Sequence, residues 1–128
     1  MIDLNTGDIL WWIPNGDTPE RISSHRLLQG VDIGNTGQPS HATTIATKTL
    51  LIYGEGRSGE PRVHAVNKQT GERVATLDIP APSNSAPMSY MHNSKQYLVL
   101  PIGGGANRHS GSLVALALPG GAPAGDEH

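Results

Sequence analysis

Three glycines near the middle of the chain have the spacing of a dinucleotide-binding loop. Residues 54–59 read Gly-Glu-Gly-Arg-Ser-Gly and follow an apolar stretch, as the phosphate-binding glycines of nucleotide enzymes do. That site also needs a helix after the glycines, because the helix N-terminus binds the pyrophosphate. Here Pro61 and the strand-like segment 62–66 follow instead. We therefore predict a hairpin loop at residues 54–59 that serves only as a connector.

The six histidines are the next candidates, as metal ligands or proton carriers. No two of them have the close spacing of paired metal ligands, and cysteine is absent, so we predict no metal site from them. His41 is the exception of interest. It follows Ser40 where an inner strand is expected to begin, and such strand ends converge on the centre of a ring-shaped β-fold. No serine lies in a nucleophile elbow, and no carboxylate pair stands out for acid–base chemistry.

Composition indicates which elements would position these residues. Only 36% of the 128 residues are hydrophobic, phenylalanine is absent, and glycine and proline contribute 16 and 10 positions. Such a chain favours short strands and turns over long helices. The net charge of −2 comes from scattered residues, which is not the basic footprint of a nucleic-acid binder. We expect no membrane span, and we find no signal-peptide pattern at the start of the chain.

The apolar runs and turn residues predict an all-β chain. A hairpin is expected at residues 2–13, and a long polar connection with one helical turn near residues 20–28 follows it. We expect residues 120–128 to be a disordered tail. The remaining predicted strands are 42–47, 50–53, 62–66, 72–79, 87–91, 96–100 and 112–118.

One turn occurs twice. The segment 3–8, Asp-Leu-Asn-Thr-Gly-Asp, returns as Asn-Lys-Gln-Thr-Gly-Glu at 67–72. Self-similarity of this kind indicates a repeat architecture, and four strands per repeat make one propeller blade. We assign residues 1–13 to the outer half of one blade, 41–79 to a complete blade, and 86–118 to three strands of another. The prediction is a partial β-propeller of about two four-stranded antiparallel blades, from the C-terminal end of a ring.

The repeated turn also has a recognisable context. The pattern Asp3, Gly7, Trp11 resembles the tryptophan-docking motif of quinoprotein dehydrogenases, the enzymes that depend on pyrroloquinoline quinone (PQQ). The second copy has Ala75 where that family has tryptophan. Residues 87–105 resemble the last-blade signature of the family, which contains a Pro-Met-Ser-Tyr run and three consecutive glycines. The resemblance covers nearly all of residues 2–119.

The resemblance implies the C-terminal blades of an eight-bladed PQQ-dependent alcohol or sugar dehydrogenase, with residues 1–119 as those blades. Ser40 and His41 would then lie at the cofactor funnel. In the complete periplasmic enzyme a calcium ion and a general base from other blades assist the quinone. The partners would be the remaining blades and a small alcohol or sugar. We expect this chain alone to be inactive and to hold neither PQQ nor calcium stably.

Structural roles are expected for the repeated residues. Gly7 and Gly71 can adopt positive φ, the first side chain of each turn can accept backbone N–H groups, and Trp11 and Trp12 can pack between blades. Two alternatives to the enzyme stay open. One is a non-catalytic propeller scaffold of the kind used in outer-membrane protein assembly, and the other is a truncated, inactive gene fragment. Calcium ligands and a base in preceding blades would favour the enzyme.

Overall fold

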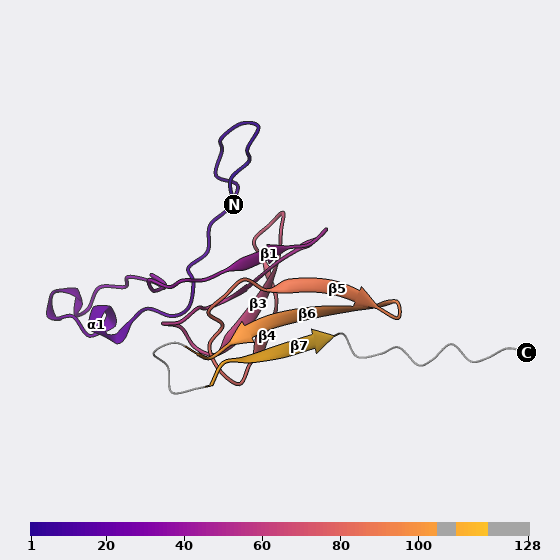
Figure 1. Cartoon of the computed structure of the whole chain (residues 1–128). Coiled ribbons are helices and arrows are strands. Elements are labelled where there is room, and N and C mark those ends of the chain that lie inside the picture. The colour runs from indigo at the N-terminus through magenta and orange to yellow at the C-terminus, as the bar shows by residue number, and fades with distance from the viewer. Residues whose placement is uncertain (105–109, 118–128) are drawn as a thin grey trace, which may run out of the picture.

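Two antiparallel sheets make up the computed structural model, which describes residues 1–104 and 110–117 (Figure 1). The first sheet has the order β1-β2-β3-β4 and the second the order β5-β6-β7. The all-β prediction is confirmed: one sheet is complete, the other has three strands, and together they form a partial β-propeller that is not closed. The strands are β1 (Thr44–Ala46), β2 (Leu50–Gly54), β3 (Arg62–Asn67), β4 (Arg73–Asp78), β5 (Met88–His92), β6 (Lys95–Ile102) and β7 (Ser112–Ala117).

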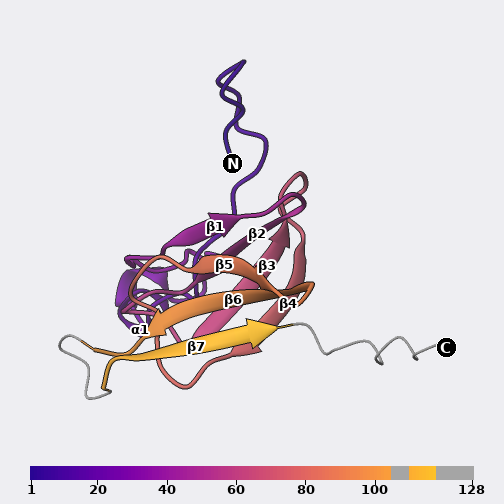
Figure 2. The same ribbon diagram turned by 45° about the vertical axis from the view of Figure 1, so that its right-hand side comes forward.

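The hydrophobic core lies between the two sheets, which cross each other in Figure 2. Side chains alternate between the two faces of a strand, so Val63 faces the second sheet whereas His64 faces the opposite side. Ile52, Leu98 and Val114 pack around the core at partial burial. The buried members of this cluster are Val63, Ile79, Ala81, Leu100 and Ile102.

The strands at the sheet edges are exposed. All six residues of β4 are exposed, and Leu113 of β7 is 72% exposed. An edge strand offers unpaired backbone N–H and C=O groups to any further strand. The described structure therefore leaves pairing positions beside β4 and β7.

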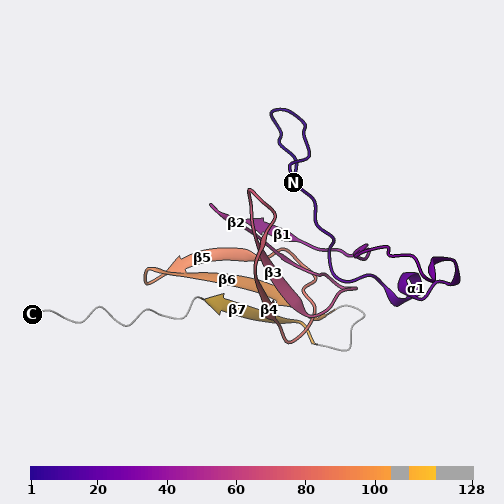
Figure 3. The same cartoon turned by 180° about the vertical axis from the view of Figure 1, so that it is seen from behind.

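The first eleven residues form a hairpin that projects away from both sheets, as Figures 1 and 3 show from opposite sides. Its two arms are joined by the bridge between Ile2 and Ile9, and the Met1 amino group donates to the Trp11 carbonyl at 2.7 Å. Trp11 joins the hairpin to the body: its Nε1–H donates to the Lys68 carbonyl at 3.1 Å. The ring also covers Gly71, where an added Cβ would lie 2.7 Å from Cδ2 of the indole. The expected packing of Trp11 is confirmed.

Packing of Trp12 was also expected, and that prediction is wrong. Its side chain is 76% exposed. Successive side chains of an extended segment point to opposite sides, so only one residue of the pair can face the turn. Trp11 takes that position.

The two copies of the repeated turn have the same hydrogen bonds. In turns 3–8 and 67–72 the N–H of the first residue donates to the carbonyl of the last, at 2.9 and 2.8 Å. The side-chain oxygen of the first residue accepts a backbone N–H at 2.8 Å in each turn. The two glycines have φ of 80° and 75°. The roles predicted for these residues are confirmed.

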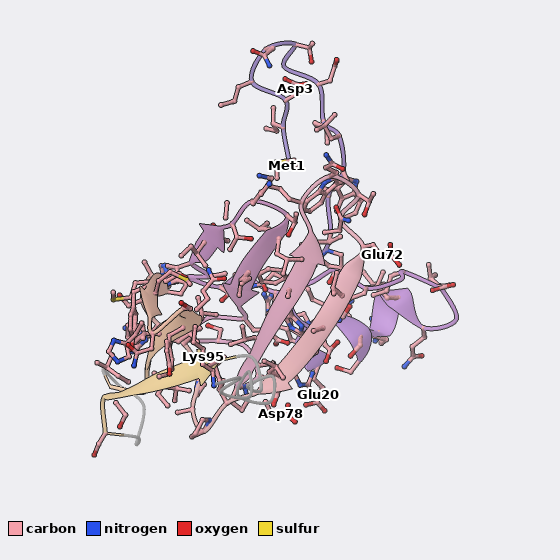
Figure 4. All side chains as sticks on the ribbon, turned by 90° about the vertical axis from the view of Figure 1, so that its right-hand side faces the viewer. Met1, Asp3, Glu20, Glu72, Asp78 and Lys95 are labelled. Carbon is pink, nitrogen blue, oxygen red and sulfur yellow. The ribbon has the colours of Figure 1, made fainter. Side chains whose placement is uncertain are left out.

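The connection between the hairpin and β1 contains the expected helical turn, as α1 (Glu20–Ser23) and a 3₁₀ helix at Arg26–Leu28. Figure 4 places Glu20 at the same end of the molecule as Asp78, far from Asp3 on the hairpin. The final predicted strand is observed as far as Ala117. The expected tail at residues 120–128 lies outside the described residues.

Candidate functional site

Ser40 and His41 lie just before β1, which begins at Thr44. Ser40 is half-buried, and its Oγ–H donates to the backbone carbonyl of Glu55. The His41 side chain is exposed. The structure thus brings Ser40 to the β2–β3 loop and leaves the His41 imidazole open to solvent. Cofactor binding by these two residues stays a prediction.

Glu55, in the β2–β3 loop that Ser40 contacts, is the most buried ionisable residue near Ser40, at 1% exposure. Its Oε1 lies 2.8 Å from Nε2 of His64. Its Oε2 accepts the backbone N–H of Glu60 at 2.9 Å. The Arg62 guanidinium lies 3.9 Å from Oε1. A buried carboxylate requires such partners, because burial removes the water that would otherwise solvate it.

His64 connects this carboxylate to the outer strand of the sheet. The ring is 2% exposed, and its Nδ1 lies 2.9 Å from Oγ1 of Thr76. Strand register pairs His64 with Tyr53 on β2 and with Thr76 on β4, so these three side chains share one face. Because an ionised Glu55 can only accept, Nε2 carries a proton, and in the neutral ring Nδ1 accepts the Thr76 hydroxyl proton.

Tyr53 packs against the imidazole, with the ring centroids 5.2 Å apart and the planes tilted by 43°. Its hydroxyl is buried without a hydrogen-bond partner among the described residues, and so is Oδ1 of Asn15. The Asn15 amide nitrogen does have a partner, since it donates to the Glu55 carbonyl at 3.1 Å. Glu55 therefore contacts Asn15 from the preceding segment as well as Ser40.

Arg62 provides a cation at the margin of this cluster. Besides Glu55, it lies 3.7 Å from Asp17 and 3.8 Å from Asp78. The Arg62 side chain is 39% exposed and both aspartates more so, and ion pairs of such exposure contribute little stability. The contact with Glu55 matters more, because that carboxylate is buried.

Glycines close the loop around Glu55. A Cβ at Gly59 would overlap Cβ of Glu55, and one at Gly56 would overlap Oγ of Ser40. A Cβ at Gly16 would lie 3.0 Å from Oε2 of Glu55. The predicted hairpin loop at 54–59 is confirmed, because β2 and β3 on either side of it are antiparallel. Its interpretation as a mere connector is wrong, since the glycines allow the chain to fold over a buried carboxylate.

The segment that leads into the second sheet contacts the first sheet at the end of β2, where the β2–β3 loop begins. A Cβ at Gly54 would lie 2.8 Å from Cβ of Ser83, which is itself buried. The Asn84 amide donates to the Gly103 carbonyl, beside a shallow open hollow that Leu113 also lines. Residues from both sheets therefore border this end of the molecule.

Among residues 1–104 and 110–117, no three His, Asp or Glu side chains are grouped as a metal site. Within the same ranges, no helix is long and apolar enough to cross a membrane.

Sequence reasoning missed Glu55 and His64. Glu55 belongs to the loop that was interpreted as a connector, and His64 was considered only as one of six histidines without the spacing of metal ligands. The available signal was strand register. Pairing 50–54 with 62–67 sets His64 beside Tyr53, and Val63 on the other face is a core position, so both faces of β3 had to be buried.

Comparison with known proteins finds one matching family and several longer relatives. A family model described as the glucose/ethanol/alcohol dehydrogenase β-propeller domain matches residues 1–98. Quinoprotein glucose dehydrogenase A of Acinetobacter calcoaceticus is 28% identical over 121 residues, which cover 92% of this chain and 15% of that protein. Quinate/shikimate dehydrogenase (quinone) of Acinetobacter baylyi is 27% identical over 121 residues, covering 91% and 15%. The chain thus spans about 15% of the length of these relatives. No solved structure matches it.

Proposed function

Because this chain belongs to the PQQ-dependent family of glucose, ethanol and alcohol dehydrogenase β-propeller domains, we propose that it supplies C-terminal blades to a dehydrogenase that oxidises an alcohol or a sugar. The observation that carries the proposal is the family match, which runs from the projecting hairpin into β6. The relatives named above are dehydrogenases and are much longer than this chain. The rest of the ring would come from a longer protein, and its working place would be the periplasm.

Ser40 and His41 are the residues that we propose for the cofactor wall. PQQ carries carboxylates beside its quinone, and an exposed imidazole such as that of His41 can donate an N–H to a carboxylate. The Ser40 hydroxyl already donates to Glu55, so it would offer its lone pairs as an acceptor. When bound, the quinone accepts the electrons taken from the substrate C–H bond. The calcium ion and the general base would belong to other blades.

The test joins this chain to the preceding blades of a quinoprotein glucose dehydrogenase and measures PQQ affinity and dye-linked activity with calcium present. We expect His41→Ala to weaken PQQ binding or lower turnover by about tenfold, the effect of losing one charge-assisted hydrogen bond. His92→Ala is the matched control, because His92 is an exposed histidine at the far end of β5. Loss of function in His92→Ala with His41→Ala unaffected would contradict the proposed wall.

The chain by itself gives a second measurement. With PQQ and calcium added, it should show no dehydrogenase activity, since the metal and base that promote C–H oxidation would be elsewhere. Turnover by the isolated chain would refute this division of roles.

A further inference from the structure

Glu55 joins three separate segments of the chain. Its carbonyl accepts the Asn15 amide at 3.1 Å and the Ser40 hydroxyl, and its own N–H donates to the Arg62 carbonyl at 3.3 Å. Segment 14–16 is tied in turn to segment 37–40, because the Gln38 N–H donates to the Asn15 carbonyl at 3.0 Å. The position of Ser40 therefore depends on where the Glu55 backbone is held.

The Glu55 side chain adds a further anchor for that backbone. Both carboxylate oxygens accept a hydrogen bond, one from the His64 ring and one from the Glu60 N–H. A neutral amide in the same place has one acceptor oxygen and one donor NH₂, so it could keep both contacts only if the His64 ring changed tautomer, with Nε2 accepting and Nδ1 donating to Thr76. A carboxylate accepts from both donors without that change of tautomer and provides charge-assisted hydrogen bonds, and His64 is its buried partner.

Two explanations of this pair make different predictions. A general support for the sheet would stabilise β3 and β4, because His64 also contacts Thr76 on β4. A positioning role would concern the loop and the residues that it holds, above all Ser40. The second explanation accounts for features that the first leaves out: the Glu55 carbonyl has two donors from outside the sheet, and the glycines at 56 and 59 fit tightly against Glu55 and Ser40.

We propose that Glu55 and His64 are a positioning pair, which holds the β2–β3 loop so that Ser40 and His41 are presented at the end of the sheet. That these residues face PQQ rests on the proposed function. The positioning of Ser40 and His41 by the pair does not rest on the proposed function, so the two parts can be tested separately.

The first experiment is hydrogen exchange with mass spectrometry on the full 128-residue chain. Glu55→Gln should speed exchange in residues 36–43 by about tenfold, the effect of losing a hydrogen bond to a charged group. Residues 88–100 of the second sheet should be unaffected. The matched control is Glu60→Gln, which removes the same charge from an exposed side chain of the same loop. Unchanged exchange at 36–43, or equal acceleration in both sheets, would overturn the proposal.

Substitutions at His64 keep the test decisive if Glu55→Gln unfolds the chain. His64→Gln retains an N–H donor for Glu55, so exchange at 36–43 should stay within about twofold of the parent. His64→Leu removes that donor while keeping an apolar side chain of similar size, and it should reproduce the acceleration. A general structural role predicts similar effects from both variants, and that result would refute positioning.

The second experiment titrates PQQ, followed by fluorescence, into the joined dehydrogenase described above. Glu55→Gln should weaken PQQ binding by about tenfold, and Glu60→Gln should leave it unchanged. If the joined protein binds no PQQ, the proposed function fails, and the exchange experiment still decides whether the pair positions residues 40 and 41. If PQQ binds and Glu55→Gln changes neither affinity nor exchange, the inference fails and the proposed function stands.

Discussion

Gly71→Ala should destabilise the chain for two reasons that can be separated. Gly71 has φ of 75°, and an alanine held there costs about 1–2 kcal/mol. The new Cβ would also lie 2.7 Å from Cδ2 of Trp11, whereas carbon atoms pack at about 3.5–4.0 Å. The indole must therefore retreat, which weakens its hydrogen bond to Lys68, a bond worth about 0.5–1.5 kcal/mol. Together with the lost ring contacts, we expect Gly71→Ala to lower the free energy of unfolding by about 2–4 kcal/mol.

A double-mutant cycle with Trp11→Ala isolates the contact. In urea denaturation followed by far-UV circular dichroism, Gly71→Ala should cost only about 1–2 kcal/mol when Trp11 is already alanine. Gly7→Ala is the control, because Gly7 has φ of 80° and open space around it. Gly7→Ala should lower the free energy of unfolding by no more than the backbone strain of an alanine at positive φ, about 1–2 kcal/mol. An equal cost of Gly71→Ala in both backgrounds would show that the indole does not depend on Gly71, and the reasoning would be wrong.

Two further predictions concern single positions. Ser94 and Asn93 form the two-residue turn between β5 and β6 with φ of 58° and 48°, so Ser94→Gly should raise the free energy of unfolding by about 0.5–1 kcal/mol in urea melts; a loss of stability would contradict this. Gly54→Ala should lower the free energy of unfolding by about 1–3 kcal/mol, because the new Cβ would lie 2.8 Å from Cβ of Ser83. Gly111→Ala, with no atom closer than 4.0 Å, is its control, and equal effects would exclude the clash.

The parts of the fold that could be predicted depend on neighbours in the sequence. A Thr-Gly turn with an Asx residue at its start forms its hydrogen bonds locally, so turns 3–8 and 67–72 follow from residue types alone. The strands follow equally well, because short apolar runs between turn residues have few alternatives. Trp11 could be assigned to packing from its residue type alone, because a large indole is usually buried, whereas its partners Lys68 and Gly71 lie far along the chain.

The Glu55–His64 pair depends on contacts that residue types alone do not specify. The two residues lie on opposite sides of a loop, and only the register of β2 with β3 brings them together. An acidic residue between glycines is ordinarily a solvated loop residue. Its burial here comes from Asn15 and Ser40, which approach from a long connection that has no periodicity to predict its course. The sequence therefore indicates the hairpin and not the carboxylate inside it.

The hairpin, the first sheet and the second sheet are joined to one another in two different ways. The Trp11 side chain attaches the hairpin at residues 1–11 to the first sheet, since it covers Gly71 and donates to the Lys68 carbonyl. After the second copy of the turn, Ala75 stands where the first copy has Trp11, and it is exposed. A methyl group cannot reach a neighbouring turn, so the second sheet needs another attachment. The apolar cluster around Leu100 provides it, which explains how the sheets stay packed although the second copy of the motif lacks its tryptophan.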